Sequence, residues 1–319
     1  MKITLISFDN WGLNKHIAST LKKNGHEVNH IDFHSFIYKY PNVLFKVYNF
    51  VLKTFFLKNI KNIYYGQEIV KRLEKIDEKQ DVIVTIKGDF IDTAYLKKIK
   101  KYTTKSIGYF NDNTHRCPKI IKAIPCFDEV FSFEKEDCEK YNLRFVANWI
   151  YVENNQETKT NFEYDIFNIS SKDKRLPILT KIAKNLKSNA VKYRFMVLDE
   201  QNPPTDRVIE FFSTKMSLSE ISKLIAKSKT LLEINRKGQN GLTFRVLESL
   251  GLQKKLVTTN AEIVHYDFYN PNNILVIDEE NPLIPAEFFL NEYEKIPEKI
   301  YYKYTLEGWI AQVIFDEKL

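Results

Sequence analysis

The chain has 319 residues, of which 44% are apolar and 14% aromatic, so it can bury the cores of two ordinary domains and is not a disordered polymer. Its formal charge of +7 suits an anionic partner, but no helix-turn-helix, zinc-finger or RNA-binding sheet signature is present, so no nucleic-acid partner is expected. The sequence also lacks an apolar run of about 18 residues, a Gly-x-x-x-x-Gly-Lys-Ser/Thr loop and a Gly-x-Ser-x-Gly elbow, which argues against a membrane span, a P-loop ATPase and a serine hydrolase.

Two features of the sequence indicate a cytoplasmic location. Cys117, Cys126 and Cys138 are odd in number and lack Cys-x-x-Cys spacing, so we expect reduced thiols. The first six residues lead directly into a strand, which is not the pattern of a signal peptide.

The first half of the chain alternates apolar runs with helical patterns. We expect strands at 3–8, 26–32, 81–88, 105–109, 127–133 and 146–149, and helices at 16–24, 44–57, 67–79, 93–101 and 134–141. This β-α-β order is typical of a Rossmann-like domain, although the Gly-x-Gly-x-x-Gly fingerprint of dinucleotide binding is missing.

Two polar loops follow strands of this half. In open α/β sheets ligands bind beyond the carboxyl ends of the strands, so the loops at 9–14 and 110–116 are candidates for a binding site. Asp112 is our first candidate for a general base, and Asp9 is the second. Either carboxylate could instead cap a helix or form an Asx-turn.

The segment 33–67 is unusual because it contains 11 aromatic residues, five lysines and no Asp or Glu. Its helix at 44–57 could be a core helix whose lysines extend to solvent, or it could lie in the interface of an anionic membrane. We expect the apolar face of the helix to be buried, and the basic-aromatic ends at 38–40 and 58–65 to make peripheral contact with the membrane.

The second half begins after a polar gap at 153–161. Strands are expected at 164–169, 193–197, 231–234, 256–259 and 273–277, and helices from 175 to 186, at 217–227 with Ser217 as the N-cap, at 242–251 and at 306–315. The helix that starts near Arg175 follows a polar loop in which Ser171 could face a phosphate or act as an N-cap.

The stretch 231–260 carries the main functional signal. A glycine-bearing loop at 237–241 precedes the helix at 242–251, and free backbone N–H groups at such a position suit a phosphate. Arg is the better bidentate phosphate binder, and two of the eight arginines in the chain, Arg236 and Arg245, fall in this stretch. Glu248 lies on the polar face of the helix, from which it could reach a pair of sugar hydroxyls; alternatively, Arg245 and Glu248 form an ordinary surface pair.

The pattern G-L-T-x-R-x-x-E-x-L-x-x-x-K-K-L-x-T-T-N, from Gly241 to Asn260, resembles the nucleotide-sugar site of GT-B glycosyltransferases that build bacterial lipopolysaccharide or capsule. The pattern Y-x-N-D-x-x-x-R from Tyr109, followed by F-D-x-V-F-S-F-E-x-x-D from Phe127, is similar to the acceptor half of that group. The resemblance implies an α/β GT-B fold with two Rossmann-like domains facing each other across a cleft. It also implies a C-terminal helix that crosses back to the first domain. The domains would then be 1–155 with a terminal helix at about 303–319, which bind the acceptor, and 156–302, which bind the nucleotide-sugar.

The resemblance also implies roles for single residues. The phosphate loop would be Gly241, Leu242 and Thr243, and Glu248 would bind the ribose. Many GT-B transferases carry an acidic residue just before this loop, whereas this chain has Gln239 and Asn240. The complete donor set is Ser171, Arg175, Arg236, Gln239, Asn240, Gly241, Leu242, Thr243, Arg245 and Glu248. The acceptor set is Trp11, Gly12, Asn111, His115 and Arg116.

These expectations describe a glycosyltransferase that moves a sugar from a nucleotide-sugar to a lipopolysaccharide or capsule glycan at the inner membrane face. No Asp-x-Asp motif is present and the six histidines are scattered, so we expect no metal and no cofactor besides the donor itself. Two alternatives remain open, namely a nucleotide-sugar epimerase on the same fold and a non-catalytic protein that binds a nucleotide or a glycan.

Overall fold

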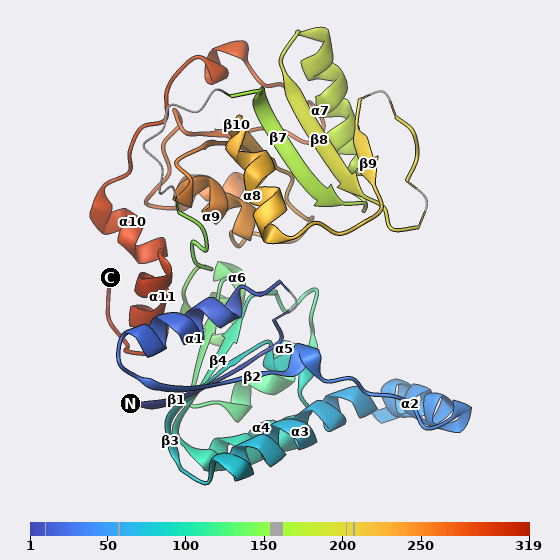
Figure 1. Ribbon diagram of the computed structural model, residues 1–319, viewed down its shortest axis with the longest axis vertical. Coiled ribbons are helices and arrows are strands. Elements are labelled where there is room, and N and C mark those ends of the chain that lie inside the picture. The colour runs from blue at the N-terminus through green and yellow to red at the C-terminus, as the bar shows by residue number, and fades with distance from the viewer. Residues whose placement is uncertain (10, 57, 154–161, 202, 207) are drawn as a thin grey trace. The chain divides into compact units, whose positions relative to one another are not determined.

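The computed structural model describes residues 1–9, 11–56, 58–153, 162–201, 203–206 and 208–319 (Figure 1). These residues form two compact units, which we call unit 1 (Met1–Ala147 with Leu306–Leu319) and unit 2 (Asn148–Thr305). Each unit is built on a parallel sheet flanked by helices, which confirms the expected α/β class. Most of the polar gap, 154–161, in which the sequence places the domain boundary, lies outside the described residues.

The described part of unit 1 has a six-stranded sheet in the order β2-β1-β3-β4-β5-β6. The strands are β1 Lys2–Ser7, β2 Glu27–Asp32, β3 Gln80–Ile86, β4 Thr103–Phe110, β5 Glu129–Ser132 and β6 Arg144–Phe145. The α-helices are α1 Asn14–Lys23, α2 Val43–Phe56, α3 Ile60–Ile76, α4 Thr93–Ile99, α5 Lys119–Ala123, α6 Lys135–Tyr141 and α11 Leu306–Val313. Short 3-10 turns lie at Phe33–Ser35, Gly88–Phe90, Lys100–Tyr102 and Ile124–Cys126.

Helix α11 belongs to unit 1 although it ends the chain. Its Trp309 packs edge-on against Tyr109 of β4, with ring centroids 5.0 Å apart, and both rings are buried. Figure 1 shows α1 and α11 on one side of this sheet and α3 and α4 on the other. The tail therefore returns to the first sheet, as the GT-B resemblance implies.

Two of the predicted element positions in unit 1 are wrong. The expected strand at 146–149 does not form, because the ladder with β5 ends at Phe145 and the carbonyl of Val146 instead accepts the hydroxyl of Tyr109. Helix α3 begins at Ile60 and not at residue 67, because the side chain of Asn59 caps it by accepting the N–H of Lys61.

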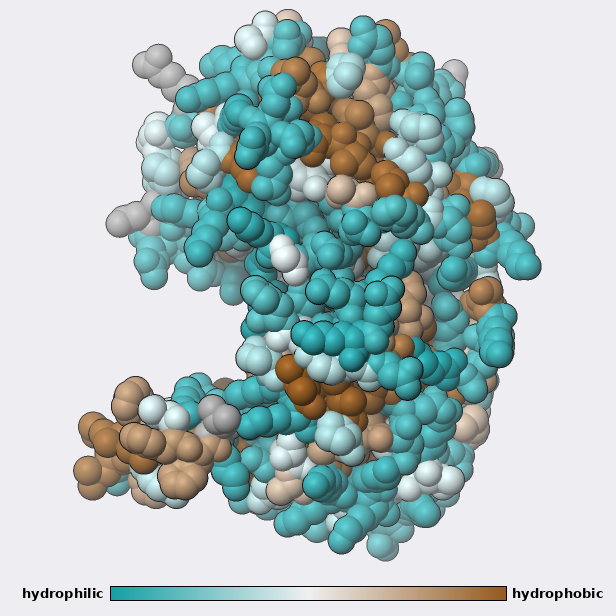
Figure 2. All heavy atoms as spheres, turned by 180° about the vertical axis from the view of Figure 1, so that it is seen from behind, coloured by the Kyte–Doolittle hydropathy of each residue, from teal (hydrophilic) through white to brown (hydrophobic). Residues whose placement is uncertain are grey.

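The apolar face of α2 is exposed, which corrects the expectation that it is buried. Asn49 is the buried residue of this helix, and it binds the hydroxyl of Tyr40 at 2.7 Å and the N–H of Ile60 at 2.9 Å. Figure 2 shows the apolar side chains of α2 as a projecting brown arm. No helix among the described residues is long and apolar enough to span a bilayer.

The described part of unit 2 has a second six-stranded parallel sheet, in the order β12-β11-β10-β7-β8-β9. The strands are β7 Tyr164–Ser171, β8 Tyr193–Leu198, β9 Glu210–Phe212, β10 Ser228–Glu233, β11 Lys255–Thr258 and β12 Ile274–Val276. The α-helices are α7 Leu176–Ser188, α8 Leu218–Ala226, α9 Phe244–Gly251 and α10 Glu298–Tyr304, and 3-10 turns lie at Ala261–His265 and Ala286–Phe289. The predicted N-cap of α8 is confirmed, because Ser217 and Glu220 form a reciprocal capping box.

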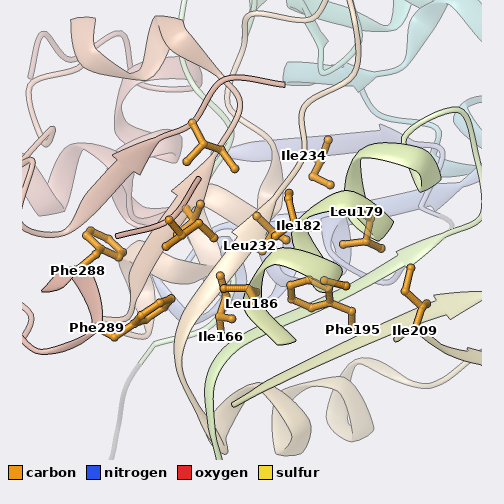
Figure 3. Packing of buried hydrophobic residues seen from close by; sticks show 14 of the residues in the cluster. Ile166, Leu179, Ile182, Leu186, Phe195, Ile209, Leu232, Ile234, Phe288 and Phe289 are labelled. Atoms are coloured by element: carbon orange, nitrogen blue, oxygen red, sulfur yellow. The ribbon is translucent and has the colours of Figure 1, made fainter. Parts of the chain in front are cut away.

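The core of unit 2 fixes α7 on the sheet. Leu179, Ile182, Ala183 and Leu186 lie at helical spacing and are almost completely buried. They pack against Ile166, Phe195, Leu232 and other strand residues, as Figure 3 shows. Because each fully buried Leu or Ile contributes roughly 1.5–3 kcal/mol, this packing holds the first turn of α7 firmly at the end of β7.

Candidate functional site

Two loops that are far apart in the sequence meet at the carboxyl edge of the unit 2 sheet. Strands β7 and β10 are parallel neighbours, so the loop after β7 and the loop after β10 emerge side by side. The guanidinium of Arg175, from the first loop, donates to the carbonyl of Ile234, at the start of the second, at 2.8 Å. The structure thereby brings together most of the donor residues that the sequence predicts.

Asp173 organises the basic side chains of this edge. Its carboxylate accepts the guanidinium of Arg175 at 2.7 and 2.9 Å, and it lies 3.8 Å from the guanidinium of Arg236. Burial raises the pKa of Asp173, but the hydrogen bonds and charge of Arg175 outweigh it and leave that pKa below its usual value. Sequence reasoning missed Asp173, although its position two residues before Arg175 was a signal.

A small pocket opens next to this ion pair. Ser171 lines it without capping α7, because Arg175 holds the N-cap position and its side chain makes no capping bond. Lys172 also lines the pocket, and its ammonium is 2.6 Å from Asp199. The other lining residues are Asn168, Ser170, Asp173, Arg175, Leu176, Leu179, Val197 and Ile234.

The glycine loop is held from behind by two asparagines. The backbone N–H of Asn235 donates to the hydroxyl of Thr259 at 2.8 Å. The side-chain amide of Asn235 donates to the carbonyl of Gln239. The amide of Asn260 donates to the carbonyl of Asn240 at 3.1 Å. Gly238 has φ +75°, a left-handed conformation that disfavours a side chain.

Helix α9 begins at Phe244, so Leu242 and Thr243 belong to the loop and not to the helix. Thr243 is in the N-cap position, but its side chain makes no capping hydrogen bond. The first turn of α9 is therefore not capped by this hydroxyl, and its backbone N–H groups end beside the loop. Leu242 is buried, and its carbonyl accepts the side-chain amide of Asn148 at 3.1 Å.

Glu248 is buried, which corrects the expectation of an exposed polar face on this helix. One carboxylate oxygen accepts the hydroxyl of Tyr151, and the other is paired with the guanidinium of Arg245. Burial, reinforced by the charge of Glu248, raises the pKa of Tyr151 and keeps its phenol a hydrogen-bond donor. A ribose could therefore bind Glu248 only by displacing one of these two partners.

The reason for this burial is the segment after Ala147, which packs along α9. The rings of Trp149 and Tyr151 lie edge-on to the ring of Phe244, at 5.3 and 6.0 Å. A Cβ at Gly251 would lie 2.1 Å from the carbonyl oxygen of Val152. Periodicity alone could not show that a second segment covers the polar side of this helix.

Glu233 is a further buried acid that sequence reasoning missed. It ends β10, is buried, and accepts the hydroxyl of Thr258 at 2.5 Å. Burial raises the pKa of Glu233, and the charges of Arg175 and Arg245 oppose that rise. A carboxylate inside the apolar run Leu231–Ile234 was the signal in the sequence, because a buried acid needs partners.

The candidate bases lie at the corresponding edge of the unit 1 sheet, and both are engaged. Asp112 is 2.6 Å from the guanidinium of Arg116 and 3.4 Å from the ammonium of Lys87. Asp9 accepts the N–H of Lys15, in the first turn of α1, at 3.0 Å. Each carboxylate therefore has a structural partner, and each is still partly exposed.

The predicted acceptor residues lie on the same two loops of unit 1. Trp11 is 49% exposed, and Gly12 has a left-handed φ of +74°. His115 and Arg116 are exposed, whereas the side-chain oxygen of Asn111 is buried and has no hydrogen-bond partner among the described residues.

Asp137 fixes the loop that carries three of these residues. Its carboxylate accepts the N–H of Thr114 at 2.7 Å and the hydroxyl of Thr114 at 2.6 Å, and both residues are buried. Asp137 is the last acid of the pattern F-D-x-V-F-S-F-E-x-x-D, so one structural reason for that spacing is to hold the neighbouring loop. Sequence reasoning quoted this residue without assigning it a role.

Asp89 is a third acid at this edge, and the sequence analysis did not single it out. It follows β3, and burial raises the pKa of its carboxyl to about 6, with a further contribution from Asp112. It is 9% exposed, so its charged form is poorly solvated at neutral pH.

We predict that Asp89→Asn stabilises the protein at pH 7.5 and not at pH 4. The folded pKa of about 6 exceeds the unfolded value of 3.8, so the folded carboxyl binds its proton more tightly. The resulting cost is absent below pH 4, grows as the pH rises to 6, and is about 1–3 kcal/mol above that. Urea unfolding at the two pH values measures it.

The control for this prediction is Asp92→Asn. Asp92 caps α4 by accepting the N–H of Ala94 at 3.0 Å, and Asn caps a helix about as well as Asp. Its unfolding free energy should change little at either pH. An Asp89→Asn protein that is no more stable than wild type at pH 7.5 would contradict the prediction.

The cysteines are not suited to nucleophilic chemistry. Burial raises the pKa of Cys117 to about 11 and that of Cys138 to about 12, so both thiols stay protonated. Among the described residues, no group of three His, Cys, Asp or Glu side chains is arranged to hold a metal ion.

Neither a known family model nor a curated protein matches the sequence. Solved structures match in fold. Anabaena Alr3699/HepE in complex with UDP and glucose has a TM-score of 0.59 at 8% identity, over 99% of this chain and 100% of that one.

Two UDP-GlcNAc 2-epimerases are also similar. The enzyme from Methanocaldococcus jannaschii has a TM-score of 0.52 at 11% identity, over 99% of this chain and 100% of that one. The enzyme from Neisseria meningitidis, bound to UDP-GlcNAc, has a TM-score of 0.51 at 13% identity, over 99% of both chains. Identities this low show a shared architecture, and the chain has the two-domain α/β fold called GT-B.

Proposed function

We propose that this protein is a metal-independent glycosyltransferase that moves a sugar from a nucleotide-sugar to a lipopolysaccharide or capsule glycan at the inner membrane face. The observation that carries the proposal is the set of three arginines, Arg175, Arg236 and Arg245, gathered beside the N-terminus of α9. The similar structures also support the proposal, because one of them is a complex with UDP and glucose and another is bound to UDP-GlcNAc.

The chemistry of transfer explains why such an edge is useful. When the glycosidic bond to the donor breaks, the departing nucleoside diphosphate gains negative charge, which arginines and a helix N-terminus stabilise. Arg175 and Arg236 lie beside one carboxylate, Asp173, so a phosphate bound there would meet two guanidinium groups. The backbone N–H groups at the start of α9, from the N-cap Thr243 onward, would supply further donors.

Unit 1 would provide the acceptor side of the reaction. A base is needed to take the proton of the attacking hydroxyl, and we assign that role to Asp112 first and to Asp9 second. Trp11, with its exposed ring, suits the apolar face of a sugar, and the polar groups on the loop of Asp112 suit its hydroxyls.

Titration with UDP, GDP, CMP and dTDP by calorimetry tests the proposal. We expect one of the four to bind, and Arg236→Ala to weaken its binding about tenfold, the cost of one charged hydrogen bond. Arg72→Ala is the matched control, because the Arg72 side chain is 44% exposed and that of Arg236 is 43% exposed, but Arg72 is on α3 of unit 1. No binding by any nucleotide would overturn the proposal.

Epimerisation on the same fold is the second candidate, favoured by the likeness to two epimerases. Inversion at a sugar carbon bearing hydrogen breaks a C–H bond, so an epimerase would introduce solvent deuterium into UDP-GlcNAc in heavy water. A transferase would leave that carbon unlabelled and release UDP when an acceptor glycan is added. Nucleotide binding with neither activity would indicate the non-catalytic alternative.

A further inference from the structure

The surface of α2 is the largest feature of unit 1 that the proposed chemistry does not use. Nine large apolar side chains of this 14-residue helix are exposed, with Leu44 75%, Phe55 73% and Phe50 66% accessible. The complete set is Val43, Leu44, Phe45, Val47, Tyr48, Phe50, Val51, Phe55 and Phe56. A contiguous apolar surface of this kind on a folded protein marks a binding interface.

Polar contacts fix the position of α2 while its apolar side chains stay exposed. Asn49, the buried residue of α2, joins the segment before the helix, through Tyr40, to the first N–H of α3. The chain on either side is therefore fixed, and the apolar side chains point outward (Figure 2).

The charges around α2 are all of one sign along the chain. Residues 33–67 contain no Asp or Glu, while Lys46 and Lys53 lie on the helix and Lys39, Lys58 and Lys61 flank it. The ammonium of Lys53 lies close enough to Lys119 for its charge, after burial, to lower the pKa of Lys119. A surface that combines exposed aromatics with lysines is complementary to anionic lipid.

An open pocket at the base of α2 adds to this basic surface. Lys58, Lys119 and Lys122 line it together with Phe56 at the end of the helix. Two carboxylates also line it, but Asp89 is buried and Asp92 is occupied in capping α4. The pocket thus places ammonium groups next to the end of the apolar surface of α2. Its remaining lining residues are Asn59, Asn62, Ile91, Thr93 and Ala123.

We propose that α2 lies within one leaflet of an anionic membrane, with its apolar side chains among the acyl chains and its neighbouring lysines at the headgroup phosphates. The inference rests on the proposed function and names its membrane contact. The helix is about 21 Å long at 1.5 Å per residue, too short to cross a hydrocarbon core of about 30 Å. It therefore lies in the interface and does not span the bilayer.

A second copy of the chain is a poorer occupant for the same surface. Pairing α2 with α2 would bring two segments together whose charges are all positive, which costs free energy. An anionic lipid surface covers the apolar side chains and neutralises the lysines at the same time.

Sedimentation with vesicles tests the inference. Phosphatidylcholine vesicles with about 30% phosphatidylglycerol should bind the protein at least about tenfold more tightly than phosphatidylcholine alone. The double variant Phe50→Ser/Phe55→Ser should bind at least about tenfold more weakly, since two aromatic side chains no longer enter the acyl region. Leu290→Ser is the control, because Leu290 is 80% exposed but lies in unit 2.

Charge variants separate the headgroup contact from apolar insertion. Lys53→Glu/Lys58→Glu should weaken binding to the phosphatidylglycerol vesicles, whereas Lys101→Glu, an exposed lysine on the turn after α4, should not. Brominated acyl chains should also quench the tryptophan fluorescence of the Phe50→Trp variant more strongly than that of the wild type.

The outcomes are separable from those of the nucleotide experiment. The vesicle assay contains no nucleotide, and the double phenylalanine variant should bind nucleotide as wild type does, so either proposal can fail alone. Wild-type sedimentation by the double phenylalanine variant would overturn the inference. The inference would also be overturned if the wild type does not bind vesicles and light scattering shows a wild-type dimer that is absent in the double phenylalanine variant.

Discussion

Glu248→Gln is expected to weaken nucleotide binding at least about tenfold while the protein stays folded. The carboxylate is 2% exposed and has two partners, Tyr151 and Arg245, and an amide can still bond to both. What the substitution removes is the negative charge that fixes Arg245 and that would accept the hydroxyls of a ribose. Such hydrogen bonds to a charged group contribute about 1.5–3 kcal/mol. Calorimetry with the nucleotide that binds wild type measures the loss.

Two further variants separate binding from stability at this position. Glu248→Ala would remove the carboxylate that pairs with Arg245 and accepts the hydroxyl of Tyr151, and we expect it to lower the free energy of unfolding by about 3 kcal/mol. Tyr151→Phe keeps the charge and removes one hydrogen bond, at a cost of about 1 kcal/mol, with the nucleotide affinity nearly unchanged. Wild-type affinity in Glu248→Gln would remove Glu248 from the ribose site.

The sequence predicts the elements of the fold better than their surroundings. Apolar runs such as Leu231–Leu232 and Val82–Ile86 predict strands because parallel strands are covered on both faces. The same rule fails at Val146–Trp149, a stretch in which three of four residues are apolar and which is buried but forms no strand. Its side chains are buried although it is not part of a strand ladder. Hydrophobicity therefore indicates burial and not backbone hydrogen bonding.

Helices α2 and α9 show that sequence periodicity does not predict whether a helix face is covered. The pattern of α2 predicts a covered helix, yet nine of its large apolar side chains are exposed. The pattern of α9 predicts one exposed face, yet the segment from Asn148 to Val152 covers it. Periodicity tells which residues share a face, and only the tertiary structure shows what lies against that face.

The sequence predicts the arginines and Glu248 of the candidate site, but not its other two carboxylates. Rarity of arginine in a lysine-rich chain drew notice to Arg236 and Arg245. Asp173, which contacts Arg175 and Arg236, and the buried Glu233 belong to segments separated by some 60 residues, and only the parallel pairing of β7 with β10 brings them to one edge. Local sequence patterns contain no record of such a pairing.

Gly251→Ala is expected to destabilise unit 2 by about 3 kcal/mol or more. A glycine at the end of a helix commonly adopts a left-handed conformation, but the residue with positive φ here is Gln253, at 51°. Gly251 is needed for space, because a Cβ there would lie 2.1 Å from the carbonyl oxygen of Val152 and 2.4 Å from a methyl group of Ile150. A backbone oxygen cannot rotate away, so the segment or the helix must shift and lose packing.

The measurement is urea unfolding followed by probes in both units, because the two units can unfold separately. Gly25→Ala is the control, since Gly25 has φ +82° but nothing within 4 Å of the added Cβ, so its cost is only the strain of about 1–2 kcal/mol. A shift of α9 would also displace Arg245 and Glu248, which lie on this helix, so Gly251→Ala should weaken nucleotide binding, whereas Gly25→Ala should not. If the two variants lose equal stability, close packing of Val152 on α9 is not what the glycine provides.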